Sequence, residues 1–283
     1  MKWQGRRGSR NIQDRRGMRG GTGRVAGIGG VGALIVVLIG AFVGVDLTPL
    51  LQGGSVSGPA SGPAGPNTID DRTEEFVSVV LADTEEVWGS IFANSGLDYD
   101  QPELVLYSGA TTSACGMANA AVGPFYCPGD QRIFLDTSFF ATLDQRLGAG
   151  GDFAFAYVIA HEVAHHVQNE IGVLGQVNQR RARLPQSEAN ELSVRIELQA
   201  DCYSGLWARH AEQRFGSLEP GDIDEAMNAA AAIGDNALQR ASQGQVVPDS
   251  FTHGTSEQRQ RWFYRGYESG DPQACDTFGA DRL

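Results

Sequence analysis

The sequence lacks several patterns that would point to common functional classes. It has no Gly-x-Ser-x-Gly pattern, so the strand-to-helix turn that carries the nucleophilic serine of α/β hydrolases is not indicated. No two cysteines are spaced Cys-x-x-Cys, which argues against a structural zinc knuckle. No internal repeat is visible, which argues against a solenoid or another repeat architecture.

Positive charge is scarce after residue 24. The chain has a net charge of −12, yet residues 1–24 hold eight basic residues and one acid, which leaves −19 for the remainder. A body this acidic would repel nucleic-acid phosphates, so we expect no nucleic-acid partner. Salt-sensitive nucleic-acid binding by the basic segment alone stays open as an alternative.

Cysteine is also scarce. The four cysteines all follow residue 46, and an even number in an oxidising compartment indicates two disulfides. A bond between Cys115 and Cys127 would close a short loop, which leaves Cys202 and Cys275 to tie the C-terminus back to a helix. Free buried thiols are the alternative.

One long apolar run is present, at residues 25–45. Its 21 residues carry no charge, which is enough for one transmembrane helix. The basic flank before it and Asp46 after it predict a cytoplasmic N-terminus and an extracytoplasmic body. A cleaved signal peptide and a buried core helix are the alternatives.

These features predict a single-pass membrane protein in four parts. Residues 1–24 would be a basic cytoplasmic tail and residues 25–45 the membrane span. Residues 46–68, rich in Gly, Ser and Pro, would be a flexible linker, and residues 69–283 the globular domain.

Residue periodicity in this domain predicts an α+β fold, mostly helical with a small sheet. Asp222 and Glu225 have the spacing of a capping box, which would begin one of the helices. We expect strands at 103–107 and 132–136, and helices at 73–94, 138–147, 152–169, 187–215, 222–242 and 256–267.

The segment 158–169 contains the pattern His-Glu-x-x-His, formed by His161, Glu162 and His165. Residues four apart on a helix differ by about 40° in direction, so both imidazoles can share one ion, and imidazole suits Zn²⁺. Glu162 would be the general base for the attacking water. An incidental set of polar residues on a surface helix is the alternative.

Catalytic zinc needs a third protein ligand. His166 lies about 140° around the helix from His161, so we expect it to be a satisfied polar residue on the helix flank. Glu197 is a better candidate, and Asp201, one helical turn later, would accept the N–H of a ligating histidine. Two solvated helix charges are the alternative for this pair.

These motifs resemble those of known peptidases. His-Glu-x-x-His followed by a helix with Glu-x-x-x-Asp is similar to the gluzincin class of metallopeptidases. The chain also resembles a bacterial family of neutral zinc metallopeptidases across nearly its whole length. The matching segments are RRGSRNIQDRRG, GPFYCPGDQRIFLD, HEVAHHVQ, IELQADCYSG and FTHGTSEQRQRWFYRG.

The resemblance implies a zincin-like fold in which an edge strand pairs with an extended substrate, and Arg132–Asp136 is our candidate for that strand. It also implies a downstream histidine that stabilises the oxyanion. His253 is the candidate, a turn or capping residue is the alternative, and Tyr203 and Arg259 are weaker candidates.

Together these features predict a membrane-anchored zinc endopeptidase that acts on peptides or proteins. A catalytically silent membrane scaffold of the same fold is the alternative. We expect His210 to be an exposed helix residue.

Overall fold

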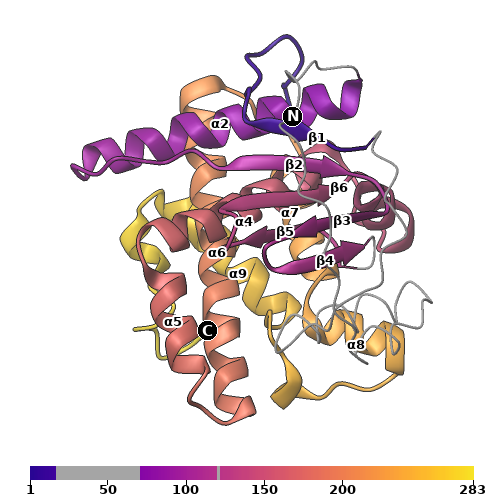
Figure 1. Ribbon diagram of the computed structural model, residues 1–283, viewed down its shortest axis with the longest axis vertical. Helices are drawn as coiled ribbons and strands as arrows, with labels where there is room; N and C mark the ends of the chain where they lie inside the picture. The colour runs from indigo at the N-terminus through magenta and orange to yellow at the C-terminus, as the bar shows by residue number, and fades with distance from the viewer. Residues whose placement is uncertain (17–70, 120–121) are drawn as a thin grey trace.

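The computed structural model describes residues 1–16, 71–119 and 122–283, in which a mixed sheet lies among long helices (Figure 1). The strands are β1 (Ile12–Asp14), β2 (Glu103–Tyr107), β3 (Ala110–Ser113), β4 (Gly116–Asn119), β5 (Phe125–Cys127) and β6 (Arg132–Asp136). The main helices are α2 (Arg72–Asn94), α4 (Asp152–Glu170), α5 (Val173–Arg181), α6 (Gln186–Phe215), α7 (Asp222–Ala232), α8 (Asp235–Gln243) and α9 (Ser256–Ser269). The α+β prediction is confirmed.

The larger sheet has the strand order β1-β2-β6-β5. β1, β2 and β6 are parallel, and β5 runs antiparallel to β6. β3 and β4 form a separate hairpin. The sequence predicted β2 and β6 with their observed bounds. It missed β1, β3, β4 and β5, because three or four residues are too few to show strand alternation.

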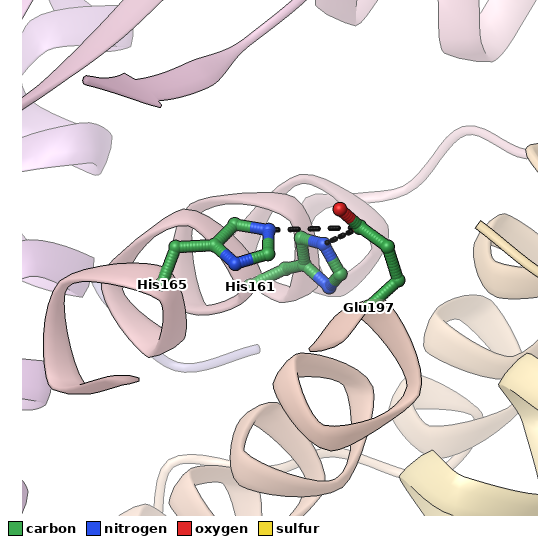
Figure 2. Close-up of side chains that lie close together, drawn as sticks. All are labelled: His161, His165 and Glu197. Carbon is green, nitrogen blue, oxygen red and sulfur yellow. Dashed lines mark hydrogen bonds and ion pairs between the residues drawn. The ribbon is translucent and has the colours of Figure 1, made fainter. Parts of the chain in front are cut away.

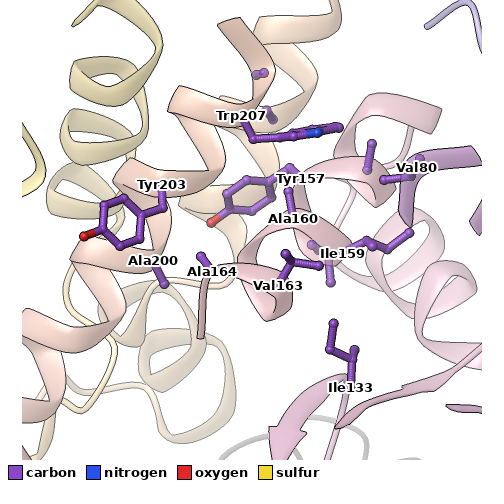
Figure 3. Close-up of a cluster of buried hydrophobic side chains, with 14 of the residues drawn as sticks. Val80, Ile133, Tyr157, Ile159, Ala160, Val163, Ala164, Ala200, Tyr203 and Trp207 are labelled. Carbon is purple, nitrogen blue, oxygen red and sulfur yellow. The ribbon is translucent and has the colours of Figure 1, made fainter. Parts of the chain in front are cut away.

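The two faces of the larger sheet are both apolar. Alternate residues of β2 and β6 (Leu104, Leu106, Ile133 and Leu135) face the main core with the helices, while Val105, Tyr107 and Phe134 form a small second cluster with Cys127. α4 packs against β5 and β6 on the core side and continues into the cluster drawn in Figure 3. α4 is therefore buried between the sheet and α6.

The helices differ from the prediction in four places, and one of them is α5, which was not predicted. Residues 138–147 are one helical turn, α3 (Ser138–Ala141), followed by a π-helical turn, η2 (Thr142–Arg146). The predicted helix 222–242 is divided into α7 and α8 at Gly234, where a Cβ would lie 2.5 Å from the backbone nitrogen of Ser256. The capping box is wrong: Gly221 is the N-cap of α7, and Glu225 instead accepts the backbone N–H of Phe153 at 3.0 Å.

Both predicted disulfides are present. Cys115–Cys127 joins the β3–β4 turn to β5, and Cys202–Cys275 joins α6 to a short 3₁₀ turn, η4 (Pro272–Cys275), near the C-terminus. No cysteine in the described ranges is free.

Residues 1–16 are packed into this domain, which corrects the prediction of a separate tail over residues 1–24. β1 pairs in register with β2, with Ile12 opposite Leu104. The buried Trp3 ring lies 5.5 Å from that of Phe76 on α2. The domain therefore begins with the N-terminal segment rather than at residue 69.

Across the described ranges, every helix is too short or too polar to cross a membrane. The predicted span at 25–45 and the predicted linker at 46–68 lie outside the described residues, so both remain predictions.

Candidate metal centre

Two imidazoles and one carboxylate meet between α4 and α6. His161 and His165 lie one turn apart on α4, with their ring centroids 4.8 Å apart, and Glu197 reaches them from α6 (Figure 2). Glu197 Oε2 lies 3.1 Å from His161 Nε2 and 3.5 Å from His165 Nε2. In a tetrahedral zinc site, ligand atoms about 2.0–2.2 Å from the ion are roughly 3.3 Å from one another. The two distances from Glu197 fit such a site, and all three donor atoms lie within 4.8 Å of one another.

The orientation of His161 is fixed by Asp201. The Nδ1 atom lies 2.9 Å from Asp201 Oδ1, which also accepts the hydroxyl of Tyr157 at 2.6 Å. Arg259 donates to both oxygens of Asp201, at 2.8 and 2.9 Å. Burial raises the pKa of Asp201, but Arg259 and His161 outweigh it and lower the pKa to about 2. Asp201 is therefore an ionised acceptor, and His161 donates from Nδ1.

The orientation of His165 is fixed by an amide. Its Nδ1 lies 2.9 Å from Gln168 Oε1, and Gln168 Nε2 donates to Ile196 O and to Gln199 Oε1. Because these donations fix the orientation of the amide, Gln168 presents an acceptor to His165. Both histidines therefore direct Nε2 towards Glu197.

The site favours a positive charge between the imidazoles and the carboxylate. Burial lowers the pKa of His161, but Asp201 and Glu197 outweigh it and raise the pKa to about 9. Burial raises the pKa of Glu197, yet the two histidines hold it well below its ordinary value. Either protons or one metal ion can supply this charge. The nitrogen, nitrogen, oxygen donor set is the one that Zn²⁺ prefers in catalytic sites.

A second set of carboxylates in the described ranges is also close enough to hold a cation. It consists of Asp152, Asp222 and Glu225. The amino group of Met1 lies 2.5 Å from Asp152 Oδ1 and 3.3 Å from Asp222 Oδ1. The ammonium group already contacts two of these three carboxylates, and Glu225 accepts a backbone N–H, so we do not assign a metal to the cluster.

Glu162 and His253 lie near the three donors. Glu162 is buried beside His161, and burial raises the pKa of its carboxyl group. His253 Nδ1 lies 3.0 Å from Asp235 Oδ1, while Asp235 Oδ2 accepts the backbone N–H groups of Thr252, His253 and Gly254. Glu197 and His253 each shift the pKa of the other, so His253 is within electrostatic range of the donors.

The weaker candidates lie elsewhere. Tyr203 packs in the core (Figure 3), with its ring centroid 5.3 Å from that of Trp88. Arg259 lies beside His161, with Nη2 3.5 Å from His161 Nδ1. His166 is satisfied, with Tyr126 Oη at 3.2 Å and the carbonyl oxygen of Asp100 at 2.6 Å. His210 is not fully exposed as predicted, since its Nε2 lies 2.9 Å from the carbonyl oxygen of Gly270.

Sequence reasoning missed four residues that hold the site: Tyr157, Gln168, Asp235 and the supporting position of Arg259. Gln168 follows His165 by three residues on one helix, so helical spacing could have found it. Tyr157 precedes His161 by four residues on the same helix, so helical spacing could have found it too. Asp235 lies on α8 and Arg259 on α9, and no local spacing connects either of them to the motif.

The expected substrate strand also needs correction. β6 is paired on both sides, with β2 and with β5, so it has no free edge. Among the described strands β1 and β5 are the outer ones of this sheet, and α4 packs against β5. β5 therefore replaces Arg132–Asp136 as the candidate edge strand.

Comparison with known proteins identifies the family of this chain. A family model described as "Putative neutral zinc metallopeptidase" matches residues 1–278. The chain belongs to this family. It is 51% identical over 287 residues to the uncharacterized protein YpfJ of Escherichia coli (strain K12), covering 99% of each chain. It is 47% identical over 195 residues to the uncharacterized protein Rv2575 of Mycobacterium tuberculosis (strain H37Rv), covering 65% of each. No solved structure matches.

The match of the family model begins at residue 1, so the N-terminal segment belongs to the family pattern together with the donor helices. This agrees with the packing of residues 1–16 against the domain.

Proposed function

We propose that this protein is a zinc-dependent endopeptidase with His161, His165 and Glu197 as metal ligands. The observation that carries the proposal is the convergence of their three donor atoms within 4.8 Å of one another from two helices. The hydrogen bonds to Asp201 and Gln168 support it, because they leave both Nε2 atoms directed at one point.

Zinc held by this set would polarise the scissile carbonyl and increase the acidity of water beside it. Glu162 accepts the proton of the attacking water and passes it to the leaving amine. Its raised pKa suits a group that must both accept and release a proton near neutral pH. His253, oriented by Asp235, donates a hydrogen bond from Nε2 to the developing oxyanion.

An extended peptide fits the outer strand. Among the described residues no strand pairs with β5 on the side away from β6, and an incoming chain can add there as a further strand. Such pairing recognises backbone rather than one terminus, which favours an endopeptidase and a zincin-like arrangement. Attachment to a membrane through residues 25–45 belongs to this proposal as a prediction from sequence.

Glu162→Gln is the first test. We expect the purified full chain to bind one zinc with or without the substitution, and Glu162→Gln to lower hydrolysis of casein or a peptide library by about 10²- to 10⁴-fold. Exposed Glu191 on α6, changed to Gln, is the matched control.

Metal content is measured by elemental analysis, and hydrolysis with and without a chelator. Unchanged hydrolysis in Glu162→Gln would remove Glu162 from the mechanism. Zinc without chelator-sensitive hydrolysis in the wild type would instead favour a scaffold.

A further inference from the structure

The N-terminal segment is held to α2 by buried ion pairs. Arg6 binds both carboxylate oxygens of Asp83, at 2.8 and 2.7 Å, and only 4% of the Asp83 side chain is exposed. Ser9 and Asn11 donate to Glu85, whose side chain is 3% exposed. A buried carboxylate that loses its partner is strongly unfavourable, so α2 requires this segment.

The last described residues of the segment are held as well. Arg16 binds Asp71 at 2.5 Å and Glu74 at 2.8 Å, and the Glu74 side chain is fully buried. Residues 16 and 71 therefore lie side by side.

These contacts give the arginines of the N-terminal segment a structural role. The charges of Arg6, Arg7 and Arg16 are matched by acids of α2 or its N-cap, in ion pairs of 2.5–3.1 Å. Arginines that are paired inside a folded domain cannot also form the basic segment that stays on the cytoplasmic side of a membrane span. Folding therefore explains three of the eight basic residues from which a cytoplasmic N-terminus was predicted.

We propose that residues 1–16 and 71–283 lie on the same side of the membrane, and that this side is extracytoplasmic. Strand pairing between β1 and β2 cannot form across a bilayer, so one crossing between residues 16 and 71 is excluded. Both disulfides lie in the same domain, and disulfides persist outside the cytoplasm. The N-terminal segment is therefore exported together with the domain.

The proposal does not depend on the peptidase activity. Any bilayer insertion of residues 25–45 must bring the chain back to the side from which it left.

Accessibility labelling tests the topology. Arg10→Cys in the segment and Leu97→Cys in the domain place a thiol at exposed positions, and Leu97 is 54% exposed. The full chain is expressed in bacterial cells, and spheroplasts are treated with a membrane-impermeant maleimide before or after permeabilisation.

We expect both thiols to be labelled in intact spheroplasts. Labelling of Leu97→Cys alone before permeabilisation would overturn the proposal and restore a single crossing. Labelling of both only after permeabilisation would overturn the assignment to the extracytoplasmic side.

A double-mutant cycle tests whether the segment is docked in the native protein. We expect Arg6→Gln to lower the thermal midpoint, and to lower it much less when Asp83→Asn is already present. Exposed Arg10→Gln is the matched control and should leave the midpoint unchanged. Equal effects of Arg6→Gln in both backgrounds would show that the contact is not formed and would overturn the proposal.

Discussion

At the scale of single residues, the side chains behind the metal ligands are as informative as the ligands. Arg259 is 2% exposed and makes two hydrogen bonds to Asp201, which in turn holds His161. A buried guanidinium keeps this carboxylate ionised, so Asp201 can only accept from the histidine. Arg259 thus orients His161 without facing the substrate.

We expect Arg259→Gln to weaken zinc binding by about 10- to 100-fold, as do other changes to groups that support metal ligands. Arg259→Lys should recover only part of the affinity, because an ammonium cannot form the two-point contact. Competition with a chromogenic chelator measures the affinity, and the absorption spectrum of the Co²⁺ form reports the ligand geometry. The exposed Arg240 changed to Gln is the control; zinc affinity equal to that control would remove Arg259 from the site.

His253 leads to a pH prediction. Burial lowers its pKa, but Asp235 outweighs burial and raises it above the ordinary value of 6.5. Since Nδ1–H points to Asp235, only the imidazolium also carries a proton on Nε2. Activity that needs this proton is present below the raised pKa and lost as the pH rises through it.

We expect Asp235→Asn to move the alkaline limb of kcat/KM to lower pH, and His253→Ala to reduce kcat by about 10²- to 10³-fold with zinc retained. The measurement is a pH–rate profile of wild type and both variants. An alkaline limb that stays in place in Asp235→Asn would assign it to another group.

At the scale of elements, the crossing of α6 and α9 holds the site together. α6 carries Glu197 and Asp201, and α9 carries Arg259. The two helices touch through glycine: a Cβ on Gly205 would lie 1.9 Å from the carbonyl oxygen of Phe263, and one on Gly266 would lie 1.8 Å from that of Cys202. Any side chain there must separate the helices.

Gly205→Ala should lower the free energy of unfolding by about 1–3 kcal/mol or more, because the backbone that the new Cβ would meet cannot move aside as a flexible side chain can. Gly89→Ala on α2 is the matched control, because a Cβ there meets nothing within 4 Å. In that control, alanine should stabilise by up to about 1 kcal/mol. Urea unfolding of both variants tests this, and equal behaviour would mean that the crossing is not tight.

Element prediction from the sequence was best where a periodic segment was long. The bounds of β2 and β6 were obtained, and α4, α6 and α9 agree to within two residues. The division between α7 and α8 was not predictable, because Gly234 is needed for contact with Ser256, a residue remote in sequence. β5 was missed for its length, so the wrong strand was assigned to the edge.

At the scale of the whole molecule, the N-terminal segment couples stability to acid pH. A hydrogen bond from Arg16 lowers the pKa of Asp14 below its ordinary 3.8. Burial raises the pKa of Asp71, but the backbone N–H of Glu74 and the Arg16 side chain outweigh it and lower this pKa too. A carboxyl whose folded pKa is lowered stabilises the fold above its ordinary pKa, and this contribution is lost as the pH falls through the folded pKa.

We therefore expect acidification below about pH 4 to release the segment and expose Trp3, which is 6% exposed in the fold. The measurement is the Trp3 fluorescence, taken as the difference between wild type and Trp3→Phe, which should shift to the red. Arg16→Gln should reduce this pH dependence. A shift of equal size in Arg16→Gln would show that other carboxyls control it.

Local physical chemistry in the sequence determined the donor motif and its helical face. Residues three or four apart lie on the same face of a helix. The shared face of His161 and His165, and that of Glu197 and Asp201, could therefore be predicted without knowing the tertiary fold. The four cysteines allowed few pairings, which made both disulfides predictable. The family resemblance rested on the same local segments.

Tertiary structure alone decided what lies around these pairs. Arg259 reaches Asp201 across 58 residues, and Arg6 reaches Asp83 across 77. The sequence does not distinguish an arginine that pairs with a buried carboxylate from one that faces solvent or a membrane surface. Water is excluded from an ion pair only when distant elements pack around it. Because of this exclusion, the pair contributes to holding the fold together.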